Sequence, residues 1–132
     1  MKTVLIVEDD PINARVFAKI LIKRGGLEVK HTEDVAEVIQ LAQSGKADLI
    51  LMDVSLANSV YEGEAVDGIK ISQLLKSDPQ TAHLPILLVT AHAMEGDREK
   101  AMAAGCDAYV TKPIQLRNFM VLLESFLEAG TL

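Results

Sequence analysis

A carboxylate stands at the end of an apolar stretch of the chain. The predicted strand at residues 47–52 ends in the apolar run 49–52 (LILM), which leads directly into Asp53. A continuous apolar run bounded by polar residues is typical of a strand buried on both faces, as in a parallel sheet. Ligands gather at the carboxyl ends of such strands. Asp53 is therefore a candidate site residue, although an aspartate there would also suit a turn.

Polar side chains also follow three other predicted strands. Glu8 and Asp9 follow residues 3–7, Thr90 follows residues 86–89, and Lys112 follows residues 108–110. Each alone has an ordinary explanation as a loop acid, a helix cap or a surface charge. In a parallel sheet, however, these ends share one edge with Asp53, so the coincidence predicts a pocket. The strand at residues 27–31, at the far edge, is expected to contribute no site residue.

These residue types suit phosphoryl transfer. Three neighbouring carboxylates disfavour one another's ionisation, so a cation is required. Oxygen donors without histidine or cysteine favour Mg²⁺ over a transition metal. Lys112 adds a positive charge and Thr90 a hydroxyl donor, which together with Mg²⁺ can stabilise a phosphoryl group moving onto a carboxylate. Asp53 is the candidate nucleophile, forming an aspartyl phosphate.

Helical patterns separate the expected strands. Asp10 and Pro11 suit the start of a helix, whose apolar face is expected from Ile12, Val16, Phe17, Ile20 and Leu21. A second helix is expected from Thr32 to Gly45, a third around residues 71–75, a fourth of about ten residues ending at Gly105, and a fifth over residues 116–127. Five alternating strand–helix units predict an α/β, flavodoxin-like, doubly wound fold, whose parallel five-stranded sheet has the strand order 2-1-3-4-5.

Length and composition limit the possible functions. The chain has 132 residues, 49% of them hydrophobic and 24% charged, with a net charge of −6. One globular domain over residues 1–132 is expected. The acidity disfavours direct nucleic-acid binding, and no apolar run suits a membrane span or signal peptide, so a cytoplasmic location is expected. Cys106 cannot form an internal disulfide and is interpreted as a small buried hydrophobe.

Five stretches of the sequence resemble the receiver domain of two-component response regulators, and together they extend over nearly the whole chain. They are VLIVEDD (residues 4–10), DLILMD (48–53), DG (67–68), LVTA (88–91) and DAYVTKP (107–113). The resemblance implies a stand-alone, CheY-like regulator that is not an enzyme. A histidine kinase or a histidine phosphotransfer protein would donate the phosphoryl group. An alternative origin is a receiver cut from a hybrid histidine kinase.

The resemblance also implies residue roles. Asp53 would be the phosphoacceptor, Asp9 a direct Mg²⁺ ligand, and Glu8 a ligand acting through water. The backbone carbonyl of Ser55 would be a further metal ligand, which side-chain identity cannot reveal.

The remaining implied roles concern the phosphate and the switch. Lys112 would contact the phosphate, and the Lys112–Pro113 peptide bond is expected to be cis. Thr90 and Tyr109 would form the switch pair, which would alter a partner-binding surface on the fourth helix, the fifth strand and the last helix. That surface is expected to include Met94, Lys100, Met102 and Tyr109.

One departure from the family pattern is a long segment after the phosphoacceptor strand. Residues 57–66 are expected to form an extended loop containing Tyr61 and two glutamates. We hypothesise that the loop overhangs the phosphorylation pocket and biases kinase choice or phosphate lifetime. The alternative is a tolerated surface insertion. Shortening the loop without changing phosphotransfer or dephosphorylation rates would exclude the functional hypothesis.

A second departure is mild. Ser55 and His92 stand two residues after Asp53 and Thr90, where the resemblance suggests that side chains tune water access to the phosphoaspartate. His92 is interpreted as an inert surface histidine rather than a general base.

The residues at particular positions argue against three rival functions. A phosphatase resembling the haloacid dehalogenases would need an acid two residues after its nucleophile, where this chain has Ser55. A flavodoxin-like nucleotide binder would need a phosphate-cradling loop in place of residues 8–10. A phosphorylation-independent interaction module would be expected only if the site were degraded, and every site residue is present.

Overall fold

A five-stranded parallel sheet forms the centre of the protein in the computed structural model, which describes residues 2–8, 10–53, 60–61, 64–65, 68–90, 97–111 and 115–129. The strand order is β2-β1-β3-β6-β7. The strands are β1 (Thr3–Val7), β2 (Glu28–Thr32), β3 (Leu49–Asp53), β6 (Ile86–Thr90) and β7 (Ala108–Thr111). This order confirms the predicted 2-1-3-4-5 arrangement, because β6 and β7 are the fourth and fifth strands of the sheet.

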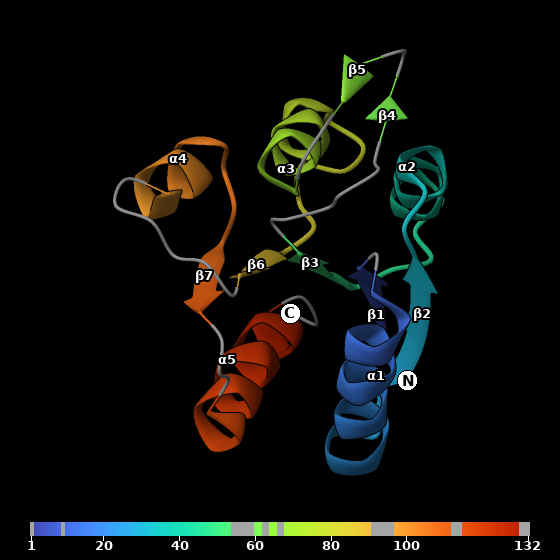
Figure 1. The fold of residues 1–132 in the computed structure, drawn as a ribbon, viewed down its shortest axis with the longest axis vertical. Helices are drawn as coiled ribbons and strands as arrows, with labels where there is room; N and C mark the ends of the chain where they lie inside the picture. Colours follow the sequence, from blue (N-terminus) through green and yellow to red (C-terminus); the bar gives the residue numbers. More distant parts are fainter. Residues whose placement is uncertain are drawn as a thin grey trace.

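Helices cover both faces of the sheet (Figure 1). One face carries α1 (Pro11–Gly25) and α5 (Leu116–Ala129), and the other carries α2 (Val35–Gln43), α3 (Gly68–Ser77) and α4 (Asp97–Ala103). The described part of the fourth helix is thus seven residues long, and residues 91–96 lie outside the description.

The three central strands, β1, β3 and β6, send alternate side chains into two separate hydrophobic cores. In β1, Val4 and Ile6 pack in the core beneath α1 and α5, whereas Leu5 and Val7 pack in the core beneath α2 and α3. All four are at most 1% exposed. Because successive strand residues point to opposite faces, this alternation also determines the side of the sheet on which residues at the strand ends lie.

The predicted start of the second helix at Thr32 is wrong. Thr32 is the last residue of β2, and α2 begins at Val35. The side chain of Asp34 caps the helix by accepting a hydrogen bond from the backbone N–H of Ala36 at 3.1 Å. Thr32 instead accepts a hydrogen bond from the backbone N–H of Asp34 through its Oγ1. Aspartate and threonine are both favourable N-cap residues, so the sequence alone could not show which of the two caps α2.

The predicted apolar face of α1 is wrong in part. Phe17 and Leu21 are buried, but Ile12 is 70% exposed and Val16 is 53% exposed. The buried stripe is Ala14, Phe17 and Leu21, with the i, i+3, i+7 spacing of one helix face. The start of the helix agrees with prediction, because Pro11 is its first residue and the side chain of Asp10 caps it by accepting the backbone N–H of Ile12. Gly26 closes the helix with a φ of 61°.

Part of the long segment predicted as a loop forms a short hairpin. Strands β4 (Val60–Tyr61) and β5 (Glu64–Ala65) pair antiparallel. The hairpin lies on the side of the sheet covered by α2 and α3, and β4 contacts α2. The prediction that residues 57–66 overhang the phosphorylation pocket falls mostly outside the described residues.

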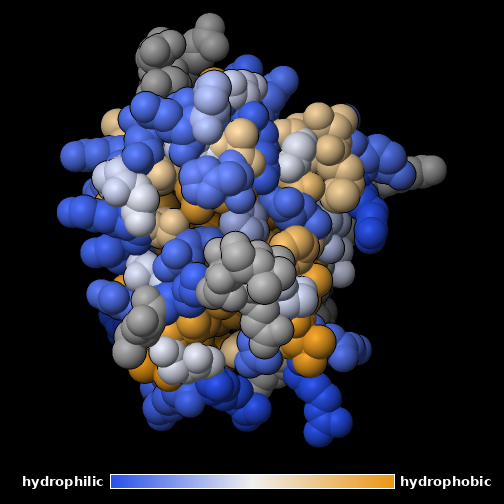
Figure 2. Space-filling model, turned by 180° about the vertical axis from the view of Figure 1, so that it is seen from behind, coloured by the Kyte–Doolittle hydropathy of each residue, from blue (hydrophilic) through white to orange (hydrophobic). Residues whose placement is uncertain are grey.

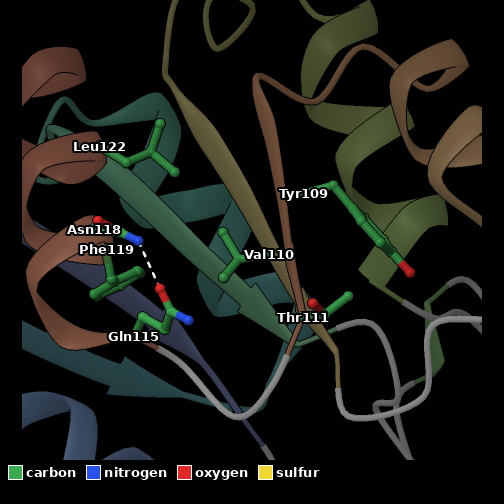
Figure 3. A pocket seen from close by; sticks show the side chains of 7 residues that line it. All are labelled: Tyr109, Val110, Thr111, Gln115, Asn118, Phe119 and Leu122. Atoms are coloured by element: carbon green, nitrogen blue, oxygen red, sulfur yellow. Dashed lines mark hydrogen bonds between the residues drawn. The ribbon is translucent and has the colours of Figure 1, made fainter.

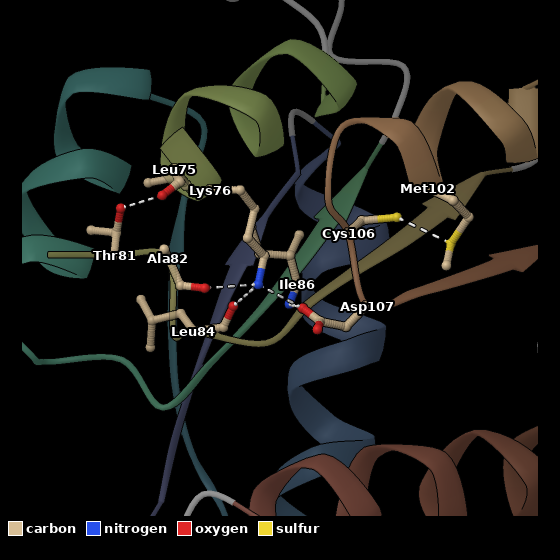
Figure 4. Close-up of polar contacts among 9 residues, drawn as sticks. All are labelled: Leu75, Lys76, Thr81, Ala82, Leu84, Ile86, Met102, Cys106 and Asp107. Atoms are coloured by element: carbon tan, nitrogen blue, oxygen red, sulfur yellow. Dashed lines mark hydrogen bonds and ion pairs between the residues drawn. The ribbon is translucent and has the colours of Figure 1, made fainter. Parts of the chain in front are cut away.

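A polar network ties α3 to the amino ends of β6 and β7 (Figure 4). Lys76 Nζ donates to the carbonyl oxygens of Leu84 at 2.7 Å and Ala82 at 3.2 Å, and lies 2.9 Å from Asp107 Oδ2. The same carboxylate oxygen accepts the backbone N–H of Ile86 at 2.8 Å. The network therefore fastens the edge of the sheet opposite Asp53.

The face seen in Figure 2 is largely hydrophilic around its periphery, with hydrophobic side chains mostly nearer its centre. Within the described ranges, no helix combines the length and apolar character needed to cross a membrane. The prediction that Cys106 is buried is confirmed, since it is 4% exposed.

Candidate functional site

The register of the sheet brings three of the predicted site residues to one edge. Val7 pairs with Met52 and Asp53 pairs with Val89. Glu8 therefore follows β1 at the level of Asp53, and Thr90 lies one residue beyond the partner of Asp53. Adjacent strands are about 4.8 Å apart, so Glu8, Asp53 and Thr90 occupy three neighbouring strand ends.

The two acids and the switch pair lie on different faces of the sheet. Ile6 and Leu51 belong to the core beneath α1 and α5, so Glu8 and Asp53, two residues further, start on that same face. Thr90 shares the opposite face with Leu88, which pairs in register with Tyr109. The strand that ends in Asp53 thus lies between the strand that leads into Glu8 and the strand that ends in Thr90.

The site residues differ in exposure. Glu8 is 3% exposed and Thr90 is 1% exposed, whereas Asp53 is half-buried at the tip of β3. A buried carboxylate requires hydrogen bonds or a cation. The combination of a buried acid, a buried hydroxyl and an accessible acid is suited to binding a charged group at Asp53.

Among the described residues, Asn13 and His31 contact Glu8 through their side chains. Asn13 Nδ2, from the first turn of α1, donates to Glu8 Oε1 at 3.0 Å. His31 Nε2, from β2, lies 2.7 Å from the backbone carbonyl oxygen of Glu8. A carbonyl can only accept, so Nε2 must carry the proton of this hydrogen bond. The strand at residues 27–31 was expected to contribute no site residue, and β2 supplies a supporting contact to the backbone of Glu8 through His31.

Gly68 packs against the backbone of Asp53. It is the first residue of α3, and a Cβ built on it would clash with the carbonyl oxygen of Asp53 and lie 3.0 Å from Met52 Cγ. Only glycine allows this close approach. Gly68, the glycine of the DG pair at residues 67–68, thus contacts the predicted phosphoacceptor directly.

Several predicted site residues lie outside the described part of the chain. These are Asp9, Ser55, His92, Lys112 and Pro113, together with the expected cis bond before Pro113. Within the described part, no group of three acids, histidines or cysteines is suited to a metal ion. Glu8 and Asp53 nevertheless supply the carboxylate oxygens at adjacent strand ends that a hard cation such as Mg²⁺ requires, so the described donors fit it.

A shallow pocket lies between β7 and α5 (Figure 3). Its volume is about 320 Å³, and its lining residues are Tyr109, Val110, Thr111, Gln115, Asn118, Phe119 and Leu122. Tyr109 and Val110 point to opposite sides of β7, and Val110 lies on the side of α5. The half-buried Tyr109 thus belongs both to the rim of this pocket and to the core beneath α3.

Two residues of the predicted partner surface are accessible. Lys100 is exposed and Met102 is 46% exposed, both on α4. Met94 lies outside the described residues. The surface of α4, β7 and α5 therefore offers exposed side chains, while its role remains a prediction.

The contacts of Asn13, His31 and Gly68 were missed from the sequence. A polar residue in the first turn of the helix that follows Glu8 was the available signal for Asn13. His31 and Gly68 gave no comparable signal, because both contacts depend on how separate units of the fold pack together.

The chain is similar to known proteins over most of its length. The family model for the response regulator receiver domain matches residues 4–124. The polar-differentiation response regulator DivK of Brucella anthropi is 38% identical over 126 residues, which are 96% of each chain. The DivK protein of Brucella ovis shows the same identity and coverage.

Two solved structures are also similar to this chain over nearly its whole length. A putative response regulator from Chloroflexus aurantiacus has a TM-score of 0.82 at 26% identity, covering 96% of this chain and 98% of that one. The receiver domain of the sensor histidine kinase PA1611 from Pseudomonas aeruginosa has a TM-score of 0.80 at 28% identity, with the same coverage. That structure has a magnesium ion coordinated in its active-site cleft.

Proposed function

The chain belongs to the response regulator receiver domain family, and we propose that it is a phosphorylation-activated signalling switch. In this proposal Asp53 accepts a phosphoryl group from the phosphohistidine of a histidine kinase or histidine phosphotransfer protein. The chain is a phosphoacceptor that assists its own phosphorylation and dephosphorylation, and it is not an enzyme acting on an external substrate.

The observation that carries the proposal is the arrangement around Asp53. A half-buried carboxylate lies between the buried acid Glu8 and the strand that ends in the buried hydroxyl of Thr90. The accessible carboxylate can act as a nucleophile, while its neighbours can position a cation and a phosphoryl oxygen.

The chemistry is a direct displacement at phosphorus. A carboxylate oxygen of Asp53 attacks the phosphorus, the phosphorus–nitrogen bond of the donor breaks, and the imidazole leaves with that electron pair. Thr90 and Lys112 would contact the transferred oxygens. Glu8, Asp9, Asp53 and the carbonyl of Ser55 would hold Mg²⁺, which supplies positive charge that offsets the charge on the phosphoryl group.

Phosphorylation would act as a bias between two conformations. It adds about −1.5 to −2 charges at Asp53. Thr90 would turn toward a phosphoryl oxygen, and Tyr109, on the same face of the adjacent strand, would move into the space released. The phosphate changes the populations of the two conformations only to the extent that it interacts more favourably with one than with the other.

The proposed output is a protein contact on α4, β7 and α5. The pocket beside Tyr109 and the exposed Lys100 and Met102 support this surface. We expect no direct nucleic-acid contact, because the chain has a net charge of −6, and we expect the protein to act in the cytoplasm. The same chemistry would apply to a receiver within a hybrid kinase.

The test is phosphorylation by a small donor. We expect incubation with acetyl phosphate or phosphoramidate plus Mg²⁺ to add one phosphate, measured by intact mass. The adduct should be absent when the metal is chelated. An unmodified wild-type protein after prolonged incubation would contradict the proposal.

A further inference from the structure

The backbone of Glu8 is held by β2. Its N–H donates to the carbonyl oxygen of Thr32 at 3.3 Å, and its own carbonyl oxygen accepts the 2.7 Å hydrogen bond from His31. The main chain at Glu8 therefore stays aligned with the sheet past the end of β1. What remains to be oriented is the carboxylate, which is separated from that backbone by three rotatable bonds.

The side chain of Asn13 contacts this carboxylate. Its Nδ2 donates to Glu8 Oε1 at 3.0 Å. Asn13 itself is placed by the start of α1, where Asp10 Oδ1 accepts the backbone N–H of Ile12 at 2.9 Å. The helix cap, Asn13 and Glu8 form a chain of contacts that runs from a fixed helix end to a buried acid.

The neutrality of the Asn13 amide matters for a cation site. A lysine or arginine at this position would compensate the charge of Glu8 and compete with the metal. An amide holds one carboxylate oxygen and leaves the negative charge in place. A carboxylate held in this way loses less conformational freedom when it binds a hydrated cation, so its affinity for the cation is higher.

We propose that Asn13 is a positioning residue for Mg²⁺: its side-chain amide orients the Glu8 carboxylate for the hydrated ion. This inference rests on the proposed function, since it requires that the site bind Mg²⁺. Partners of this kind, which contact a ligand rather than the metal, typically change metal affinity about 10–100-fold when they are removed.

The test is the Mg²⁺ affinity of Asn13→Leu, a variant of similar shape that has no donor. Titration calorimetry with MgCl₂ on the unphosphorylated protein should show a dissociation constant raised by about 10-fold. Gln43→Leu is the matched control. Gln43 is an exposed residue of α2 whose amide donates to Asp78 Oδ2 at 3.0 Å, and its replacement should leave the Mg²⁺ affinity unchanged.

A second measurement uses the wild-type Asn13 side chain as the reporter. Its side-chain amide resonances, assigned by nuclear magnetic resonance, should shift when MgCl₂ is added, and should shift in Glu8→Ala without metal. This measurement stands even where Asn13→Leu is too unstable to titrate. The melting temperature of Asn13→Leu is also measured without Mg²⁺. A wild-type value shows that the substitution affects only the metal-bound state, and a lower value shows that it destabilises the whole protein.

The outcomes distinguish the two proposals. Equal Mg²⁺ affinity in Asn13→Leu and wild type, or Asn13 amide resonances that do not respond to Glu8→Ala, would overturn the role of Asn13 and leave the proposed function standing. A wild-type protein that neither binds Mg²⁺ nor accepts a phosphoryl group would instead contradict the proposed function.

Discussion

The contact between Gly68 and Asp53 predicts a large effect from adding one methyl group. In Gly68→Ala the new Cβ would clash with the carbonyl oxygen of Asp53 and lie 3.0 Å from its carbonyl carbon. Asp53 is part of β3, which is hydrogen-bonded between β1 and β6. The backbone of a strand paired on both sides cannot move easily. Relieving the clash therefore requires a strained shift of α3 or of Asp53.

The size of the effect follows from two opposing terms. Overpacking a well-packed site lowers the free energy of unfolding by about 1–3 kcal/mol, whereas replacing glycine by alanine in a helix raises it by up to about 1 kcal/mol. A net loss of about 1–2 kcal/mol is expected. With an unfolding entropy of about 2.1 cal/mol/K per residue and 132 residues, the melting temperature should fall by about 4–7 °C.

The displacement of Asp53 should also slow its phosphorylation. A misplacement of about 1 Å at a reacting group can cost about 100-fold, so a fraction of that shift should slow the reaction by about 10-fold. The assay is the rate of adduct formation with phosphoramidate and Mg²⁺, followed by intact mass, alongside thermal unfolding monitored by circular dichroism.

Gly26→Ala is the matched control. Gly26 has a φ of 61°, and a Cβ added to it would meet no neighbouring atom within 4 Å. Alanine there costs about 1 kcal/mol through the left-handed backbone conformation, far from Asp53. It should lower the melting temperature and leave the phosphorylation rate unchanged. Wild-type stability and rate in Gly68→Ala, or an equal slowing in Gly26→Ala, would refute the steric argument.

Three further predictions concern Lys76, Cys106 and Thr90. Lys76→Ala should lower the free energy of unfolding by about 2 kcal/mol, because it breaks the charged hydrogen bonds to two carbonyls and Asp107, whereas exposed Lys19→Ala should change it by less than about 0.5 kcal/mol in denaturant titrations. Burial, then the charge of Asp107, raises the pKa of the Cys106 thiol. Iodoacetamide should therefore label Cys106 slowly at neutral pH until the protein unfolds, and rapid native labelling would contradict this. Thr90→Val should still be phosphorylated but should lose the phosphorylation-dependent shift of the Tyr109 resonances; an unaltered shift would exclude the switch pair.

Much of the fold followed from local sequence patterns. The buried strands appear in the sequence as apolar runs. The alternation of strands with helices is compatible with only a few strand orders in the sheet. The helix expected over residues 116–127 is α5, and it buries Phe119, Met120, Leu123 and Leu127, because its apolar residues recur with a single helical period.

The errors arose where two local signals competed. In α1, Ile12 and Val16 have the hydrophobicity of core residues but lie on the solvent side. Ala14, a small residue with a weak hydrophobic signal, takes the buried position. At the start of α2, Thr32 and Asp34 are both capping residues, and only the hydrogen bond from Ala36 identifies Asp34 as the cap.

The site was predicted in its outline and missed in its supporting contacts. Positions at the carboxyl ends of parallel strands are determined by topology, so Glu8, Asp53 and Thr90 could be grouped before their contacts were known. The contacts of Asn13 and Gly68 depend on the angles at which α1 and α3 approach the sheet. Those angles result from packing the whole core, which no local pattern specifies.

The central claim is that Asp53 carries the phosphoryl group, and chemical trapping tests it most directly. Reduction of the phosphorylated protein with sodium borohydride converts an aspartyl phosphate into homoserine, and tandem mass spectrometry of the peptides locates it. We predict homoserine at position 53 alone, only when Mg²⁺ and the phosphodonor were both present, and none in Asp53→Asn. Homoserine at another aspartate, or none in a protein that carries the phosphate, would contradict the account.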